Sequence, residues 1–99
     1  MTELDPLIHA PARLRVMATL AALGPGDQVT FPVLQRTLDM TAGNLSTHLR
    51  RLEEADYVNV TKTFAGRTPS TRVGLTARGR LAFEDYTRAL TDLLGGGAS

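Results

Sequence analysis

Hydroxyl, amide and guanidinium groups gather in a short stretch near the middle of this 99-residue chain. The stretch is TAGNLSTHLRRLEEADY, residues 41–57. Side chains of these types read base edges and hold the phosphates of double-stranded DNA. The stretch therefore predicts nucleic-acid recognition, and its candidate contacts are Thr41, Asn44, Ser46, Thr47, Arg50 and Arg51.

The same stretch has the apolar spacing of an amphipathic helix, which we place at residues 42–55. Leu45, Leu49 and Leu52 lie at i, i+4 and i+7 and so share one face. Thr41 precedes them as an N-cap, because its hydroxyl can accept from the backbone N–H of Asn44. The opposite face of this helix carries Gly43, Thr47, Arg50 and Glu54.

An ordinary surface helix would explain the same residues, with Arg50 pairing to Glu54 at i, i+4. The charge distribution favours the nucleic-acid interpretation. Residues 41–80 hold seven Lys and Arg against three Asp and Glu, whereas both ends of the chain are mildly acidic. A basic middle of this kind predicts one cationic face, as a polyanion-binding protein needs.

The elements around the central helix predict a helix-turn-helix. Apolar residues predict a helix at 12–23, which Gly24, Pro25 and Gly26 end. A short strand is expected at 27–30, and a second helix at 31–38 with Thr30 as its N-cap. The turn from this helix into Thr41 is about three residues long, which is the helix-turn-helix spacing.

In the second half of the chain the spacing of apolar residues changes from that of a helix to that of a strand. Val58, Val60 and Phe64 alternate with polar residues, which predicts a strand with these three facing inward. Residues 65–70 hold Gly and Pro and are expected as a loop, followed by a return strand at 71–76. A final helix is expected at 77–94, with Thr76 as its N-cap. We therefore expect one domain at residues 1–95 and a disordered tail at 96–99.

This order of elements resembles the winged helix-turn-helix regulators of the MarR and ArsR type. The resemblance covers roughly residues 7–94 and rests on Thr41…Asn44 to Glu53, on Tyr57-Val58, on Gly66-Arg67…Pro69 and on Leu75-Thr76…Gly79-Arg80. The fold class that it implies is mostly α with a small β-hairpin (α+β), namely a winged helix-turn-helix with an extra C-terminal dimerisation helix. Three positions depart from the pattern: Gln35 stands where a small residue is common, and Asp39 and Asp56 stand where Gly is common.

The resemblance implies a DNA-binding transcriptional regulator, in the first place a repressor, that acts as a homodimer. Helix 42–55 would enter the major groove, and Gly43 would let its start come close to the DNA. The wing, residues 62–72, would contact the backbone and the minor groove through Lys62, Arg67, Thr68 and Arg72. The final helix and the N-terminal lead-in hold more apolar residues than one small core needs, and the expected dimer contacts are Leu4, Leu7, Ile8, Phe83, Tyr86, Leu90, Leu93 and Leu94.

Other functions have less support in the sequence. Ser46 and His48 would point about 200° apart on a helix, so they cannot form a nucleophile–base pair, and no enzyme is expected. The chain has no Cys, and Asp5 with His9 is the one pair at metal-ligand spacing, so neither metal nor cofactor is expected. We expect His48 to be half-buried and hydrogen-bonded. The absence of a long apolar run predicts a cytoplasmic protein without membrane contact.

Two alternatives remain open at this point. A winged helix can be a protein–protein module whose basic face contacts an acidic partner, without DNA. A small-molecule effector could bind between the helices at a dimer interface, although no residue indicates one.

Overall fold

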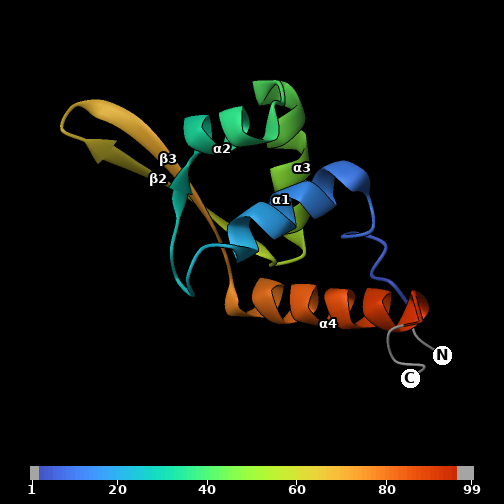
Figure 1. The fold of residues 1–99 in the computed structure, drawn as a ribbon. Coiled ribbons are helices and arrows are strands. Elements are labelled where there is room, and N and C mark those ends of the chain that lie inside the picture. The colour runs from blue at the N-terminus through green and yellow to red at the C-terminus, as the bar shows by residue number, and fades with distance from the viewer. Residues whose placement is uncertain (1–2, 96–99) are drawn as a thin grey trace.

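The computed structural model describes residues 3–95 and contains four helices and a three-stranded antiparallel sheet (Figure 1). The expected α+β class and the winged helix-turn-helix order are confirmed. The expected tail at residues 96–99 lies outside the described residues. In chain order the elements are α1 (Pro11–Ala21), β1 (Val29–Thr30), α2 (Phe31–Leu38), α3 (Ala42–Glu54), β2 (Val58–Ala65), β3 (Thr68–Leu75) and α4 (Ala77–Leu93).

One hydrophobic core joins the helices to the inner end of the sheet. Helix α3 buries the stripe expected from its spacing, because Leu45, Leu49 and Leu52 are each at most 3% exposed. Helices α1 and α2 meet it with Met17 and Leu34, which are fully buried. This packing fixes the orientation of α3, so its opposite face points away from the core.

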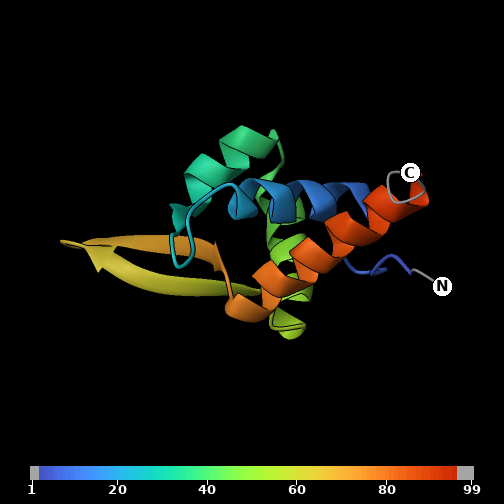
Figure 2. The same cartoon turned by 60° about the horizontal axis from the view of Figure 1, so that its bottom comes forward.

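The sheet carries a hairpin that projects beyond the helices (Figures 1 and 2). Its strand order is β1-β3-β2, and β1 pairs with β3 only at Val29–Val73 and Thr30–Arg72. Strands β2 and β3 have eight residues each and therefore reach about 26 Å. The outer part of this hairpin, residues 62–72, is the expected wing.

The turn of the wing is shorter than the sequence predicted. Ala65 pairs with Thr68, so only Gly66 and Arg67 form the turn, and the expected loop at 65–70 is wrong. Gly66 has φ +66°, which suits the first position of a two-residue hairpin turn. Pro69 is tolerated in β3 because β1 does not reach this part of the strand, so no second neighbour needs its missing N–H.

The wing also changes the expected position of Phe64. This side chain is 73% exposed, so the prediction that it faces the core is wrong. The alternation holds along β2, and Val58 is buried, but the strand runs past the helices before it reaches Phe64. The sequence period gives the face of a strand but not the point at which the core ends.

The start of α4 is held against the end of α3. Thr76 is the expected N-cap, because its Oγ1 accepts from the N–H of Gly79 at 2.8 Å. The Thr76 hydroxyl also donates to the carbonyl of Asp56, and its backbone N–H donates to the carbonyl of Tyr57. A Cβ on Gly79 would lie 1.9 Å from that Tyr57 oxygen, so only glycine allows this approach.

Two arginines join helices instead of facing solvent freely. The guanidinium of Arg80 donates to the carbonyls of Ala21 and Leu23, where α1 ends two residues earlier than expected. Arg15 donates to the carbonyl of Leu38 at the end of α2 at 2.6 Å. The carbonyls of Ala21 and Leu38 belong to the last turns of α1 and α2, so each arginine satisfies a carbonyl that a helix end leaves without a partner.

The N-terminal lead-in is an ordered turn against the body. The side chain of Asp5 accepts from the N–H of Leu7 and from the hydroxyl of Tyr57. The bond from Tyr57 to this carboxylate, together with burial, raises the pKa of Tyr57 to about 12. Next to this turn Ile8 is fully buried, and Tyr86 is 2% exposed within one protomer. The prediction that these two side chains contact a second copy is therefore wrong for this arrangement.

Both aspartates that replace a common glycine adopt the left-handed conformation. Asp39 has φ 54° and Asp56 has φ 62°. Aspartate tolerates this region better than most residues, because its short polar side chain can bond locally. The turns before and after α3 therefore keep the backbone geometry of the winged helix-turn-helix pattern, although aspartate stands where glycine is common.

The N-cap of α2 differs from the expectation. Thr30 does stand at the N-cap position, but its side chain makes no capping hydrogen bond.

Candidate nucleic-acid interface

The outward face of α3 presents the polar groups that the sequence singled out. The N–H of Asn44 donates to Thr41 Oγ1 at 3.1 Å, so the expected N-cap is confirmed. The hydroxyl of Thr47 donates to the carbonyl of Gly43 at 3.0 Å and keeps its acceptor lone pairs outward. The candidate residues of this helix are all exposed, namely Thr41, Gly43, Asn44, Ser46, Thr47, Arg50 and Arg51.

Arg50 lies one turn beyond these groups without a carboxylate partner. Within residues 3–95 the ion pair of the chain is Arg88–Asp85, and Arg50 does not pair with Glu54. The interpretation of α3 as an ordinary surface helix depended on the Arg50–Glu54 pair, so the structure does not support it. The guanidinium can therefore meet an external anion without first breaking an internal contact.

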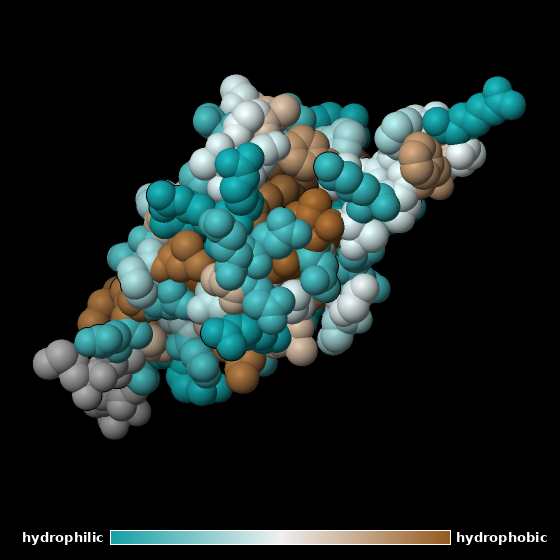
Figure 3. All heavy atoms as spheres, turned by 180° about the vertical axis from the view of Figure 1, so that it is seen from behind, coloured by the Kyte–Doolittle hydropathy of each residue, from teal (hydrophilic) through white to brown (hydrophobic). Residues whose placement is uncertain are grey.

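A groove of about 380 Å³ separates α3 from the wing. Its apolar wall is formed by Phe31, Leu49 and Val60. Its polar side chains are Ser46, Arg50, Glu53, Lys62 and Thr71. Figure 3 shows apolar atoms among hydrophilic ones at the base of the wing. The structure thus brings Lys62 of the wing to the same groove as Ser46 and Arg50.

The pairing register distributes the other wing residues over two faces. Residues opposite each other in an antiparallel pair point to the same side of the sheet. Lys62 pairs with Thr71 on the side of the groove, whereas Arg72 pairs with Thr61 on the other side. Arg67 is in the turn itself, and Thr68 follows it in the first pair of the hairpin. Lys62 and Arg72 therefore flank the tip from opposite faces.

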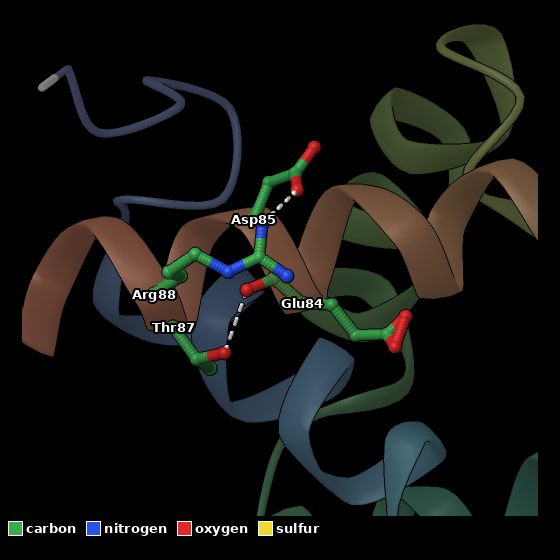
Figure 4. A network of polar contacts seen from close by, with 4 residues as sticks. All are labelled: Glu84, Asp85, Thr87 and Arg88. Carbon is green, nitrogen blue, oxygen red and sulfur yellow. Dashed lines mark hydrogen bonds and ion pairs between the residues drawn. The ribbon is translucent and has the colours of Figure 1, made fainter.

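Charge separates this side of the molecule from the exposed side of α4. Residues 58–75 contain three cations and no carboxylate. From residue 84 to its end, α4 holds Glu84, Asp85 and Asp92 against Arg88. Figure 4 shows Arg88 turned toward Asp85, with which it pairs at 3.3 Å, beside Glu84 and Thr87. A polyanion is attracted to the side of α3 and the wing and repelled by the far end of α4.

His48 lies on the buried edge of α3 and is half-buried, as expected. Its Nδ1 is buried without a hydrogen-bond partner, so the expectation that it would be satisfied is wrong. Burial lowers the pKa of His48, and the positive charges of Arg13 and Arg51 lower it further. The neutral imidazole is therefore the form that this fold favours.

This depressed pKa predicts an acid-sensitive contribution to stability. The unfolded chain binds the His48 proton near the ordinary pKa of 6.5, before the folded protein does. Stability is therefore complete above about pH 6.5 and falls below it, by at most about 1.4 kcal/mol per pH unit for one proton. Chemical unfolding of wild type and His48→Gln between pH 5 and 8 should show this loss in wild type only. Parallel profiles would contradict the assignment.

Two residues of this region were not singled out as functional by the sequence. Phe31 lines the groove as the first residue of α2, and Phe64 stands exposed on the wing. The alternation in the second half of the chain assigned Phe64 to the inward face of its strand, and nothing in the sequence marked Phe31, so neither residue carried a signal for a surface role. Their positions follow from where α2 begins and how far β2 extends.

Two further properties concern the described residues. No helix within residues 3–95 combines the length and apolarity needed to cross a membrane. In the same range, no three His, Asp or Glu side chains come together as a metal-ligand group. Asp5 instead bonds Tyr57, and His9 Nδ1 hydrogen-bonds with the hydroxyl of Tyr86 at 2.8 Å.

Comparisons with known proteins agree with this geometry. The family described as winged helix DNA-binding domain matches residues 12–94. An uncharacterized protein of Methanocaldococcus jannaschii is 30% identical over 87 residues, which are 88% of this chain and 91% of the relative.

Solved structures of other proteins are also similar to this chain. A transcriptional regulator homologue protein from Pyrococcus horikoshii OT3 has a TM-score of 0.82 and 31% identity, over 91% of this chain and 86% of that one. The S. aureus MepR–DNA complex has a TM-score of 0.74 at 21% identity, over 93% of this chain and 73% of that one. The similarity to MepR is a similarity of fold.

Proposed function

The chain belongs to the winged helix DNA-binding domain family, and we propose that it is a sequence-specific, double-stranded DNA-binding repressor that acts as a homodimer. Helix α3 enters the major groove, and the wing contacts the backbone and the minor groove. The observation that carries the proposal is the exposed polar face of α3, which the core holds outward beside an acid-free wing.

The dimensions of α3 suit this role. A helix of about 10–12 Å diameter matches a major groove of about 12 Å. Gly43 has open space where a Cβ would stand, so the first turn can approach the DNA closely. Asn44, Ser46 and Thr47 then reach base edges, while Arg50 reads a base or clamps a phosphate. Arg51 is assigned to a phosphate on the shoulder of the helix.

The wing supplies the second set of contacts. Arg67, at the tip, is placed to enter the minor groove, where the negative potential attracts arginine. Lys62 and Arg72 point to opposite sides of the hairpin and can each meet a phosphate across that groove. Thr68, beside the tip, can donate to a third phosphate. A protein that occupies DNA in this way blocks access to it, which is why we assign repression.

A homodimer would use the far end of α4. Leu93 and Leu94 are 62% and 77% exposed, and Phe83 and Leu90 are only partly buried. Leu4 and Leu7 of the lead-in are partly buried as well, and Ile8 and Tyr86 support the surface from beneath. A two-fold pair of such chains would place two copies of α3 about 34–36 Å apart.

The dimer can be tested separately from DNA binding. We expect light scattering at micromolar concentration to give twice the mass of the 10.7 kDa chain. Leu94→Glu should shift this mass toward the monomer, because a charge would then be buried at the interface. Arg88→Glu, a change on another face of the same helix, is the control. A wild-type monomer under these conditions would remove the dimer from the proposal.

Selection of bound sequences from random duplexes tests the proposed function as a whole. We expect enrichment of a near-palindromic site whose half-sites are about 10–10.5 base pairs apart, or a multiple of that. Binding without enrichment would leave a non-specific DNA protein. No binding even at low salt would favour an acidic protein partner for the same basic face.

A further inference from the structure

An aromatic side chain stands exposed on the wing among cations. Phe64 is 73% exposed although Pro69 lies directly opposite it on β3. Phenylalanine favours strands, and a cross-strand pair with proline would stabilise the hairpin in part. That pair covers little of the ring, so most of its apolar surface is left for another contact.

The register defines what lies around this ring. Alternate residues of β2 share a face, so Phe64 lies on the same side as Lys62 and Val60. Arg67 is in the turn three residues further along. The ring therefore stands between the groove beside α3 and the tip of the wing. Cations lie on both sides of it, and residues 58–75 include no carboxylate.

We propose that Phe64 and Pro69 form an apolar contact with the deoxyribose wall of the DNA minor groove, beside the site of Arg67. This inference rests on the proposed function and names a further contact within it. Apolar side chains such as phenylalanine do enter or line minor grooves in other DNA-binding proteins. A membrane or a protein core would need a far larger apolar patch than one ring and one proline.

The contact has a thermodynamic signature that separates it from the arginine. Removing a cation that meets a phosphate lowers the dependence of affinity on salt, because fewer counterions are released. Removing an apolar contact lowers the affinity but leaves the salt slope unchanged. We expect Phe64→Thr, which keeps strand propensity, to weaken binding roughly tenfold at constant salt slope.

Thr63 offers a matched control. It lies beside Phe64 on β2, is exposed, and points to the opposite face with Ser70. Thr63→Ala should therefore leave both the affinity and the salt slope as in wild type. If Phe64→Thr binds the selected duplex as tightly as Thr63→Ala does, the contact does not exist.

A fluorescence measurement gives a readout that hairpin stability alone would not change. The chain has no Trp, so Phe64→Trp would introduce one reporter on the proposed contact and Thr63→Trp one on the opposite face. On adding the highest-affinity duplex from the selection, the indole of Phe64→Trp should shift to the blue and become several-fold less accessible to acrylamide. The indole of Thr63→Trp should stay accessible.

The outcomes separate this inference from the proposed function. An indole in Phe64→Trp that remains equally accessible in the bound protein would overturn the Phe64 contact while DNA binding stands. A wild-type protein that binds no duplex at any salt concentration would overturn both.

Discussion

Replacing Gly79 with alanine is expected to lower the free energy of unfolding by about 3 kcal/mol or more. The added Cβ would lie 1.9 Å from the carbonyl oxygen of Tyr57 and 2.7 Å from its carbon, both of which are backbone atoms. Relief requires α4 to move away from Tyr57, which also breaks the bond from the Thr76 N–H to that oxygen. Urea unfolding followed by circular dichroism measures the loss.

Gly43 provides the matched control for this change. It is also a helical glycine, but nothing lies within 4 Å of the Cβ that alanine would add. Gly43→Ala should therefore raise the stability by up to about 1 kcal/mol, through helix propensity. If Gly79→Ala is as stable as Gly43→Ala, then α4 does not rest on Tyr57 as described. The same Gly43→Ala protein should bind DNA more weakly, since the proposal brings this turn close to the duplex.

Replacing Arg50 with alanine is expected to cost about 1–3 kcal/mol of binding to the selected duplex, up to roughly a hundredfold in affinity. Arg50 is exposed, lines the groove opposite Lys62 and forms no ion pair within the described part of the chain. Its truncation should therefore leave folding unchanged and act on the complex alone. Fluorescence anisotropy of a labelled duplex measures the affinity.

Arg88→Ala is the control for charge, because it removes one arginine from the exposed side of α4. We expect this variant to bind DNA as wild type does. If Arg50→Ala and Arg88→Ala both bind like wild type, Arg50 contacts neither a base nor a phosphate. Loss of specificity at one base position in Arg50→Ala would identify a base contact, whereas a uniform loss would identify a phosphate contact.

The local parts of this fold could be predicted from the sequence because their causes are local. Thr41 and Thr76 were expected as N-caps, and each accepts a backbone N–H from three residues further on, which for Thr41 is the predicted N–H of Asn44. The stripe Leu45, Leu49 and Leu52 was expected to be buried, and it is. In each case the responsible atoms lie within a few turns of one helix.

The failures have a common origin in contacts between distant parts of the chain. Ile8 and Tyr86 were assigned to a dimer because the excess of apolar residues is visible in sequence, but their burial within one protomer is not. The contact of Arg80 with the end of α1 was not predicted for the same reason, because its partners lie 57 and 59 residues earlier in the chain. The wing turn was overestimated because Pro69 signals a loop unless one knows that β1 stops before it.

In the candidate interface, too, the local features could be predicted from the sequence, whereas the contacts between distant segments could not. The residue types of α3 and of the wing were sufficient to select the polar candidates. Their grouping required the register, which places Lys62 with Arg50 at the groove and Arg72 on the other face. The exposure of Phe64 depended on the length of the hairpin beyond the core.

The most direct test of the central claim is the salt dependence of duplex binding by wild type and by Arg67→Ala. Fluorescence anisotropy at low and moderate salt would give the slope of the affinity against salt concentration for each protein. We predict tight binding by wild type that falls steeply with salt, and a slope about one unit smaller for Arg67→Ala. A wild-type protein that leaves the duplex unbound even at low salt would contradict a DNA-binding role for α3 and the wing.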